Sequence, residues 1–227
     1  PLTALLGIYS LQIAAFFGGL VTTFVLYRVA TSAGQTAIAT MLLAGIAIAA
    51  LASAVTGVLV YVATDSQLRD LTFWGLGSLS GANWTKIMAS CPIILLALAA
   101  AAFLARGLNA LTLGEATAGH LGLPVQRFKL AAIVTVAAAT GAAVAVPGGI
   151  GFVGIVVPHL LRLIIGPDHR FLLPASALLG ASFLLLADAV SRLVVAPAEL
   201  PIGIVTAAVG GPFFLWILLR RRQAIAW

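Results

Sequence analysis

Charged side chains are scarce in this sequence. Six Asp or Glu and twelve Lys or Arg occur among 227 residues, so charged residues make up 8% of the chain. In a soluble domain, about a quarter of the residues are charged. Residues of the AVILMFWYC set account for 62% of the sequence. This balance excludes a water-soluble domain and predicts a polytopic membrane protein.

Cysteine is almost absent as well. The single cysteine, Cys91, excludes a disulfide within the chain and is interpreted as a small core residue. The sequence contains neither G-x-x-x-x-G-K-[ST], the loop that cradles nucleotide phosphates, nor H-E-x-x-H, a zinc-binding helix motif. We therefore expect no catalytic residue, no metal site and no permanently bound cofactor. The net charge of +6 does not indicate nucleic-acid binding, because the basic residues stand at the ends of apolar runs.

Seven apolar runs dominate what is present. A helix that spans a bilayer needs about 20 predominantly apolar residues, and an open sheet cannot satisfy its edges in lipid. The fold class is therefore predicted to be all-α, with about seven spans in a single domain over residues 1–227. The chain starts at Pro1 with no basic segment before the first run, which we interpret as the loss of N-terminal spans of a longer protein. The runs cover residues 4–27, 37–63, 89–105, 129–146, 150–166, 171–190 and 201–219.

The basic residues predict the orientation of these spans. If Arg220, Arg221 and Arg222 face the cytoplasm and the spans alternate, nine positive charges lie inside and three lie outside. The opposite orientation reverses that ratio, so the positive-inside rule places the C-terminus in the cytoplasm. Residues 107–129, called the elbow below, then lie on the cytoplasmic side too.

Residues 65–88 form the longest connection on the outer side. Leu68, Leu71 and Trp74 recur at i, i+3 and i+6, and Trp74 and Trp84 suit a membrane–water interface. Two interpretations stay open: a short re-entrant or interfacial helix, or an ordered loop anchored by its aromatic residues.

Two spans contain helix-breaking residues. Pro158 lacks a backbone donor and would crowd the carbonyl of Gly154. Gly210, Gly211 and Pro212 repeat this composition in the last run. We predict that both helices are interrupted at these residues, as in many channels and carriers, where protein or a water-filled cavity satisfies the freed backbone groups.

The elbow is the one polar, punctuated segment between spans. Thr112 and Glu115 fit the S/T-x-x-E capping box, which predicts a helix from Leu113. Gly122 is placed to end that helix with a positive φ, and Pro124 is placed to begin a second short helix. The alternative is a single amphipathic helix that rests on lipid headgroups.

Three stretches of the chain resemble the FecCD family, the permeases of ABC importers for cobalamin, iron-siderophores and haem. The resemblance implies a type II permease of ten spans, of which this chain would hold the fourth to the tenth. It also implies a homodimer in the bacterial inner membrane, two cytoplasmic ATPase subunits that bind ATP, and a periplasmic substrate-binding protein. The stretches are LTLGEATAGHLGLPVQRFK, GGIGFVGIVVPHLLRLIIGPDHRFLLPASALLGASFLLLADAVSRL and PAELPIGIVTAAVGGPFFLWILLRR.

The same resemblance implies roles for individual residues. Arg192 would pair with a glutamate of the binding protein, and Asp188, four residues earlier, could aim its guanidinium. The alternative is that Asp188 and Arg192 only satisfy each other at a helix end, with Glu199 at the rim. Residues 109–128 would be the pair of coupling helices that docks on the ATPase. The coupling residues would be Thr112, Gly114, Glu115, Ala116, His120, Leu121, Gly122 and Pro124.

The transport path is implied by resemblance too. Residues 42–61 and 202–214 of two copies would line the channel, and Thr36, Ile38, Ala39 and Thr40 would form its cytoplasmic gate. Ile38 and Ala39 stand where the cobalamin permease has small hydroxyl residues, so the gate chemistry differs there.

Residues 41–84 are most similar to the hemin branch of the family, which implies haem as the transported substrate. Cobalamin and an iron-siderophore are the alternatives, and His120, His159 and His169 are not expected to hold haem permanently. A seven-helix photoreceptor would need a Schiff-base lysine within a span, but the two lysines stand at span ends. An ion-coupled secondary carrier, a more distant alternative, would need acidic residues near the midplane.

Overall fold

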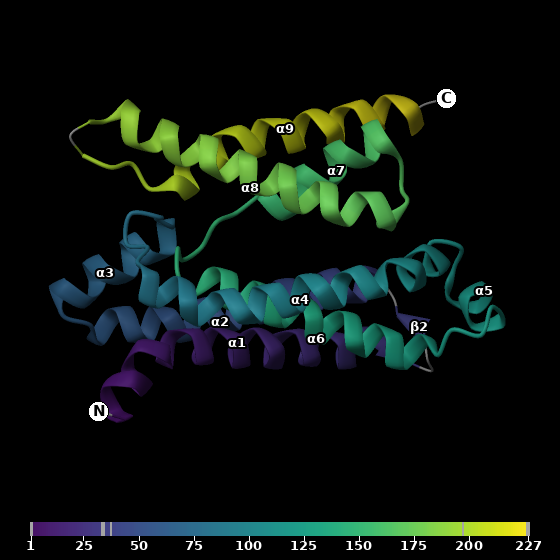
Figure 1. Cartoon of the computed structure of the whole chain (residues 1–227), viewed down its shortest axis with the longest axis horizontal. Helices are drawn as coiled ribbons and strands as arrows, with labels where there is room; N and C mark the ends of the chain where they lie inside the picture. The colour runs from purple at the N-terminus through teal and green to yellow at the C-terminus, as the bar shows by residue number, and fades with distance from the viewer. Residues whose placement is uncertain (1, 33–34, 37, 197, 226–227) are drawn as a thin grey trace. The chain divides into compact units, whose positions relative to one another are not determined.

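The structure, a computed structural model, describes residues 2–32, 35–36, 38–196 and 198–225. Within these residues the chain forms nine α-helices and one two-stranded hairpin (Figure 1). In chain order the elements are α1 (Leu2–Ala30), β1 (Thr31–Ser32), β2 (Gln35–Thr36), α2 (Ile38–Val62), α3 (Asp65–Leu76), α4 (Trp84–Leu111), α5 (Glu115–His120), α6 (Val125–Val144), α7 (Val153–Ile165), α8 (His169–Val194) and α9 (Ile202–Ile225).

Each of the seven predicted spans corresponds to one long helix: α1, α2, α4, α6, α7, α8 and α9. The all-α fold class is confirmed, because the only strands in the described residues are the two-residue strands of the hairpin. By length and composition, α2, α4, α6 and α8 can each cross a membrane. The helices α1, α7 and α9 contain shorter apolar segments.

The apolar side chains of these helices mostly face outward. None of the most hydrophobic 18-residue window of α2 is buried, and Leu43 and Ile46 are 69% and 68% exposed. Fully burying one such side chain stabilises a protein by about 1.5–3 kcal/mol relative to leaving it in water. A helix with this surface is stable only where lipid or another protein chain covers it.

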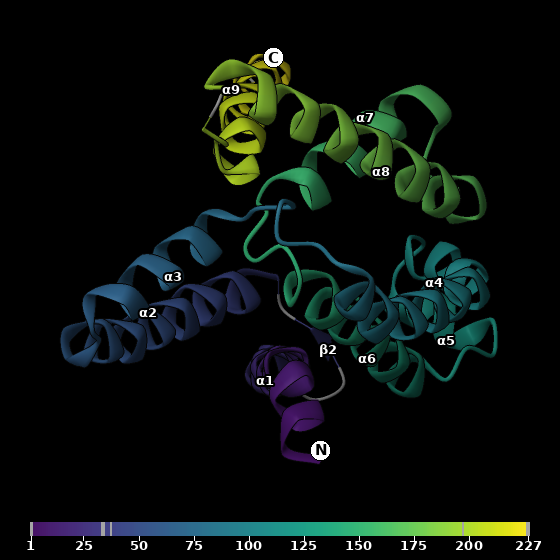
Figure 2. The same ribbon diagram turned by 60° about the vertical axis from the view of Figure 1, so that its left-hand side comes forward.

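The chain divides into two compact units, and the first comprises residues 1–72 and 83–146. In this unit α6 packs against both α1 and α4, and α2 packs against α1 (Figures 1 and 2). The close approach of α4 and α6 requires a glycine: a Cβ on Gly107 would overlap the ring of Phe128. The short helix α5 follows α4 and packs against the beginning of α6.

The second unit comprises residues 73–82 and 147–227. Here α8 packs against α7 and α9, and α7 also contacts α9. The buried core is formed by Val157 and Leu161 of α7 and Leu172 of α8. Val157 and Leu161 are four residues apart, the spacing that places two side chains on one face of a helix.

The C-terminal end of α3 is held in this second unit by backbone hydrogen bonds. The Trp74 carbonyl accepts from the Gly149 N–H, and the Gly77 carbonyl accepts from the Ile202 N–H at 3.0 Å. Gly148 has φ +79, and a Cβ there would overlap the carbonyl of Trp74. This glycine junction joins the end of α3, the connection after α6 and the start of α9.

The structure decides between the two interpretations of residues 65–88. Residues 65–76 form the helix α3, which contains no buried residue. The ordered-loop alternative is therefore wrong for this part of the connection.

The predicted interruptions of two spans are wrong. The helix α7 continues through Gly154 and Pro158, and α9 continues through Gly210, Gly211 and Pro212. A proline in a helix crowds the carbonyl four residues earlier. That residue is Gly154 for Pro158, and α7 accommodates this proline without ending.

Candidate functional sites

The elbow contains one separate short helix, α5. The predicted capping box is wrong, because Thr112 caps the end of α4 instead of starting α5. Its hydroxyl donates to the Asn109 carbonyl at 2.7 Å. Gly114 is the N-cap of α5, with φ 101 and no side-chain cap bond. Because the Thr112 hydroxyl bonds at the end of α4, it does not cap α5. The positive φ of Gly114 separates the two helices.

Gly122 ends α5 as predicted, with φ +85. The Gly122 N–H bonds to the Gly119 carbonyl at 3.0 Å, and the Leu123 N–H bonds to the Ala118 carbonyl at 3.1 Å. These two bonds form a Schellman motif, which satisfies the last carbonyls of a helix. Ala118 is fully buried. The turn after α5 is therefore fixed by backbone geometry.

The second predicted short helix does not exist as a separate element. Pro124 is the N-cap of α6, which runs without interruption from Val125 to Val144. The sequence after Pro124 contains no glycine or proline until Gly141, so nothing stops the helix. The predicted coupling segment 109–128 consists of the end of α4, the helix α5 and the first turn of α6.

An ion pair joins α5 to α6. The Lys129 Nζ lies 2.5 Å from the Glu115 Oε1, and the two side chains are 13% and 33% exposed. The second carboxylate oxygen of Glu115 is buried and has no hydrogen-bond partner. The sequence analysis assigned Glu115 to a capping box and did not predict this pair. The opposite charges of Glu115 and Lys129 on either side of the predicted turn could have indicated it.

The outer surface of the elbow is partly apolar. Leu113 and Leu121 are well exposed at the two ends of α5, and the predicted coupling residues Ala116 and His120 are exposed between them. The α5 helix lies beyond the ends of α4 and α6 (Figure 1). This surface can contact a protein partner.

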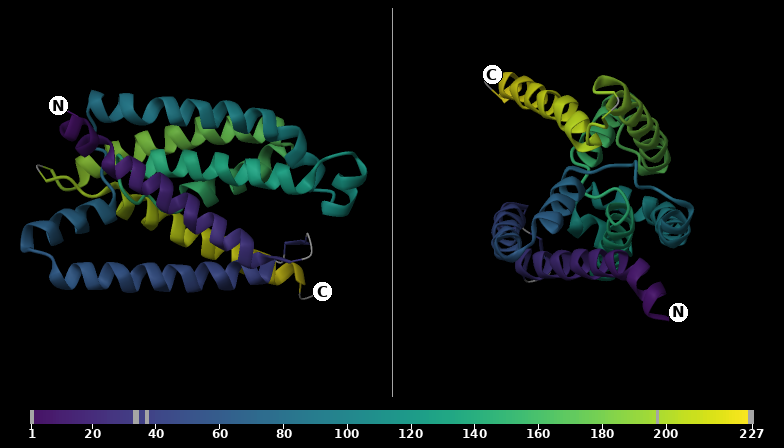
Figure 3. Two further views of the ribbon diagram at one scale, coloured as in Figure 1. Left: turned by 90° about the horizontal axis from the view of Figure 1, so that it is seen from below. Right: turned by 90° about the vertical axis from the view of Figure 1, so that its left-hand side faces the viewer.

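The predicted gate residues lie in and just after the β1–β2 hairpin. Thr31 pairs with Thr36, and Ser32 pairs with Gln35. Ala37 lies outside the described residues, and α2 begins at Ile38. Ala39 and Thr40 are exposed in the first turn of α2. The hairpin lies at the same end of the first unit as α5 in Figure 1 and in the left panel of Figure 3.

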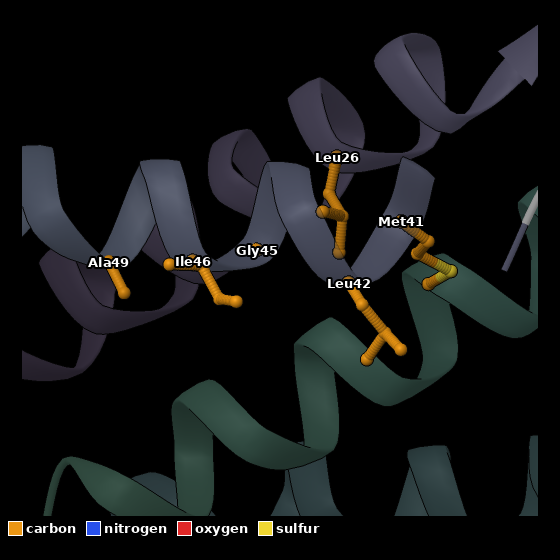
Figure 4. A pocket seen from close by; sticks show the side chains of 6 residues that line it. All are labelled: Leu26, Met41, Leu42, Gly45, Ile46 and Ala49. Atoms are coloured by element: carbon orange, nitrogen blue, oxygen red, sulfur yellow. The ribbon is translucent and has the colours of Figure 1, made fainter. Parts of the chain in front are cut away.

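An apolar pocket of about 460 Å³ opens between α1 and α2, close to the hairpin. Figure 4 shows the side chains that line it. The predicted channel-lining segment 42–61 lies within α2 and begins at this pocket. The lining residues are Leu26, Met41, Leu42, Gly45, Ile46 and Ala49.

The second site is a charge cluster near the end of α8. The Arg192 Nε donates to the Asp188 Oδ2 at 2.9 Å, and the Arg192 Nη1 donates to the Glu199 Oε1 at 3.4 Å. The i,i+4 pair of Asp188 and Arg192 is confirmed. The Ser191 carbonyl accepts from the Leu200 N–H, which brings Glu199 back to the helix. Almost half of the Arg192 side chain remains exposed.

The three histidines lie in three different helices, and one of them, His120, belongs to the elbow. His120 is in α5, His159 is in α7, and His169 begins α8. Among the residues that the structure describes, no three His, Cys, Asp or Glu side chains are grouped so that they could hold a metal ion.

Known proteins with similar sequences are transport proteins. The model of the FecCD transport family matches residues 2–220. The hemin transport system permease protein HmuU of Yersinia pestis is 46% identical over 222 residues, which are 98% of this chain and 66% of that protein. The cobalamin import system permease protein BtuC of Halobacterium salinarum is 43% identical over 219 residues, 96% of this chain and 58% of that protein.

A further relative is the vitamin B12 import system permease protein BtuC of Klebsiella pneumoniae, 42% identical over 214 residues, which are 94% of this chain and 64% of that protein. The chain therefore spans two thirds or less of the length of these three permeases. A solved structure of a metal-chelate type ABC transporter in an inward-facing conformation has a TM-score of 0.80 and 30% identity. That match covers 94% of this chain and 72% of the other.

Proposed function

Because this chain belongs to the FecCD transport family, we propose that it acts as the membrane-spanning permease subunit of an ABC importer that moves haem into the cytoplasm. The observation that carries the proposal is the match of the family model to residues 2–220, together with the seven apolar helices. The subunit is not an enzyme in this proposal. ATP is bound and hydrolysed by separate ATPase subunits.

The proposed mechanism is alternating access. Two copies of the permease form the path in the bacterial inner membrane, with the C-terminus and the elbow on the cytoplasmic side. Two ATPase subunits dock on the elbow, and the exposed Leu113 and Leu121 offer the apolar contacts of that surface. ATP-driven closure of the ATPases moves α5, and this movement shifts the channel-lining segments 42–61 and 202–214.

A periplasmic substrate-binding protein docks on the permease at Arg192 in this proposal. Arg192 would donate hydrogen bonds to a carboxylate of that protein, because its guanidinium remains partly exposed between Asp188 and Glu199. Charged pairs across an interface guide encounter and fix register. Thr36, Ile38, Ala39 and Thr40 would form the cytoplasmic gate, since they directly precede or begin α2.

Haem is the proposed cargo, and cobalamin is the second candidate. The identity of 46% to a hemin permease supports haem, while 43% and 42% to two cobalamin permeases support the alternative almost as well. The side chains of α2 that line the pocket beside α1 are apolar. Such a surface suits a large, partly apolar cargo that must also be released, because release requires weak contacts along the path.

The cargo is tested by uptake into proteoliposomes. Transporter reconstituted with its ATPase and its binding protein should accumulate haem in an ATP-dependent manner and in preference to cobalamin. Equal or greater uptake of cobalamin would overturn the haem assignment and would leave the permease function intact. Absence of ATP-dependent uptake of either cargo, or of an iron-siderophore, would contradict the permease function itself.

A further inference from the structure

Side chains at the start of α6 contact three other helices, α1, α4 and α5. The Tyr27 hydroxyl of α1 donates to the Gln126 side-chain carbonyl. The Phe128 ring packs against Gly107 of α4, where a Cβ would overlap it. The Lys129 ammonium binds Glu115 of α5. All of these residues belong to the first compact unit.

The helical geometry of α6 explains how one turn makes three contacts. Residues three apart in an α-helix are neighbours on its surface, so Gln126 and Lys129 lie on the same side of α6, and Phe128 projects from another side. Gln126 contacts α1 and Lys129 contacts α5, whereas Phe128 contacts α4. We call residues 125–129 the α6 hub.

The contact with α1 leads directly to the predicted gate. Tyr27 stands four residues before Thr31, the first residue of the β1–β2 hairpin. Ala30, between them, is buried at 2% exposure. The hairpin then connects within two residues to α2, whose first residues are Ile38 and Ala39. The last turn of α1 is therefore joined through the paired strands to the start of α2.

We propose that Tyr27 and Gln126 are positioning residues that pass movement of the elbow to the gate hairpin. This proposal rests on the proposed function, because it assumes that α5 is moved by an ATPase. The Glu115–Lys129 ion pair ties α5 to the hub, and the Tyr27–Gln126 hydrogen bond ties the hub to α1. The route is contiguous: α5, the α6 hub, the end of α1, the hairpin and α2.

The Glu115–Lys129 ion pair and the Tyr27–Gln126 hydrogen bond differ in strength. This difference decides which of the two should be removed by substitution. Lys129 is mostly buried, so breaking its ion pair leaves an uncompensated charge and disturbs the fold. The Tyr27–Gln126 bond is exposed to solvent and joins two neutral side chains. Removing a neutral hydrogen bond changes an equilibrium by a factor of about two to ten. Substitutions at this bond can therefore change coupling while the protein still folds.

The experiment reports nucleotide-dependent movement at the hairpin in the assembled transporter with its ATPase subunits. A thiol is introduced by Ala39→Cys in a Cys91→Ser background, because Ala39 is exposed directly after the hairpin. The rate of its alkylation by a maleimide is measured without nucleotide and with ATP plus vanadate. The reporter protein must first assemble with the ATPase subunits and show a nucleotide-dependent alkylation rate. Tyr27→Phe and Gln126→Leu each remove the hydrogen bond, whereas Gln126→Glu keeps a side-chain acceptor.

Tyr27→Phe and Gln126→Leu should each reduce the nucleotide-dependent change in alkylation rate about two- to tenfold. The double variant should be no worse than either single variant, and Gln126→Glu should retain most of the change. Thr135→Val is the matched control, since the Thr135 hydroxyl bonds to the Ala131 carbonyl of α6 itself at 2.8 Å. Size-exclusion chromatography with the ATPase confirms that each variant assembles.

Two results would overturn the proposal. The first is an unchanged nucleotide response in both Tyr27→Phe and Gln126→Leu. The second is an equal loss in Gln126→Glu and Gln126→Leu, since a lost acceptor could not then be the cause. Failure of the proposed function is distinguishable: if Gly122→Val, which distorts the end of α5, also leaves transport coupled, the elbow itself is not the coupling element.

Discussion

Arg192 forms ion pairs with two carboxylates that lie at unequal distances. Its Nε lies 2.9 Å from the Asp188 Oδ2, whereas its Nη1 lies 3.4 Å from the Glu199 Oε1. Asp188 is on the same helix and is the less exposed of the two acids, so this bond orients the guanidinium. The bond to Glu199 is longer and joins two half-exposed side chains. A carboxylate of a docking partner would therefore replace Glu199 and leave Asp188 in place.

Substitutions of Arg192 and Glu199 should change the affinity for the binding protein in opposite directions. Arg192→Glu should weaken the complex, because it places three carboxylates together and like charges at an interface can cost several kcal/mol. Glu199→Gln should strengthen binding, since it removes an exposed ion pair that competes for the Arg192 guanidinium. Both effects should shrink at high salt. The measurement is titration of permease in nanodiscs with the loaded binding protein.

Basal ATP hydrolysis serves as the control for these variants and should survive in both. If Arg192→Glu leaves the affinity unchanged, Arg192 is only a helix-end partner of Asp188. If Arg192→Glu weakens the complex but Glu199→Gln leaves the affinity unchanged, Arg192 binds the partner while its ion pair with Glu199 stays in place.

The turn after α5 should tolerate only glycine. Gly122 has φ +85 with open space around a Cβ, so Gly122→Val is strained by its backbone alone, by about 1–2 kcal/mol. The variant should still insert, assemble and bind the binding protein, but lose ATP-driven uptake. Gly119→Val is the matched control, because Gly119 is helical and has equal space. The measurement is paired ATPase and uptake assays in proteoliposomes, and coupled transport in Gly122→Val would reduce the elbow to a passive segment.

The sequence predicts the spans well because their signal is local. Apolar runs of suitable length can only be helices in lipid, and all seven correspond to helices in the structure. The resemblance of three stretches to the FecCD family is confirmed by the family match. The positive φ of Gly122 was also predictable, since a glycine before a proline-led helix suits the C′ position.

The errors concern positions where one residue has two possible partners. Thr112 can cap the helix before it or the helix after it, and the sequence alone does not say where α4 ends. Pro158 removes one backbone donor from α7, and the sequence alone does not say whether the helix continues through such a residue, as it does in the structure. The α6 hub was missed because Tyr27 and Gln126 are 99 residues apart.

The Glu115–Lys129 ion pair should contribute to the stability of the elbow. Lys129→Met leaves the Glu115 carboxylate, whose Oε2 is already buried without a partner, with an uncompensated charge. We expect a loss of about 1–3 kcal/mol, below the 3–5 kcal/mol of a fully buried pair, because Glu115 is one-third exposed. The double variant Glu115→Gln, Lys129→Met should recover part of this loss. Thermal unfolding in detergent measures both, and additive losses would show that the pair is not coupled.

The glycine junction in the second unit should be the position most sensitive to a single added methyl group. Gly148→Ala combines an unfavourable φ of +79 with a Cβ that overlaps the Trp74 carbonyl, whose position is fixed by the Gly149 N–H. We expect a loss of at least about 2 kcal/mol, the sum of backbone strain and displaced packing. Gly151→Ala is the control, because no atom lies within 4 Å of its Cβ position and its φ is not positive. Equal unfolding temperatures for the two variants would mean that α3 is not held by this junction, since only Gly148→Ala pushes the end of α3 away from the chain that follows α6.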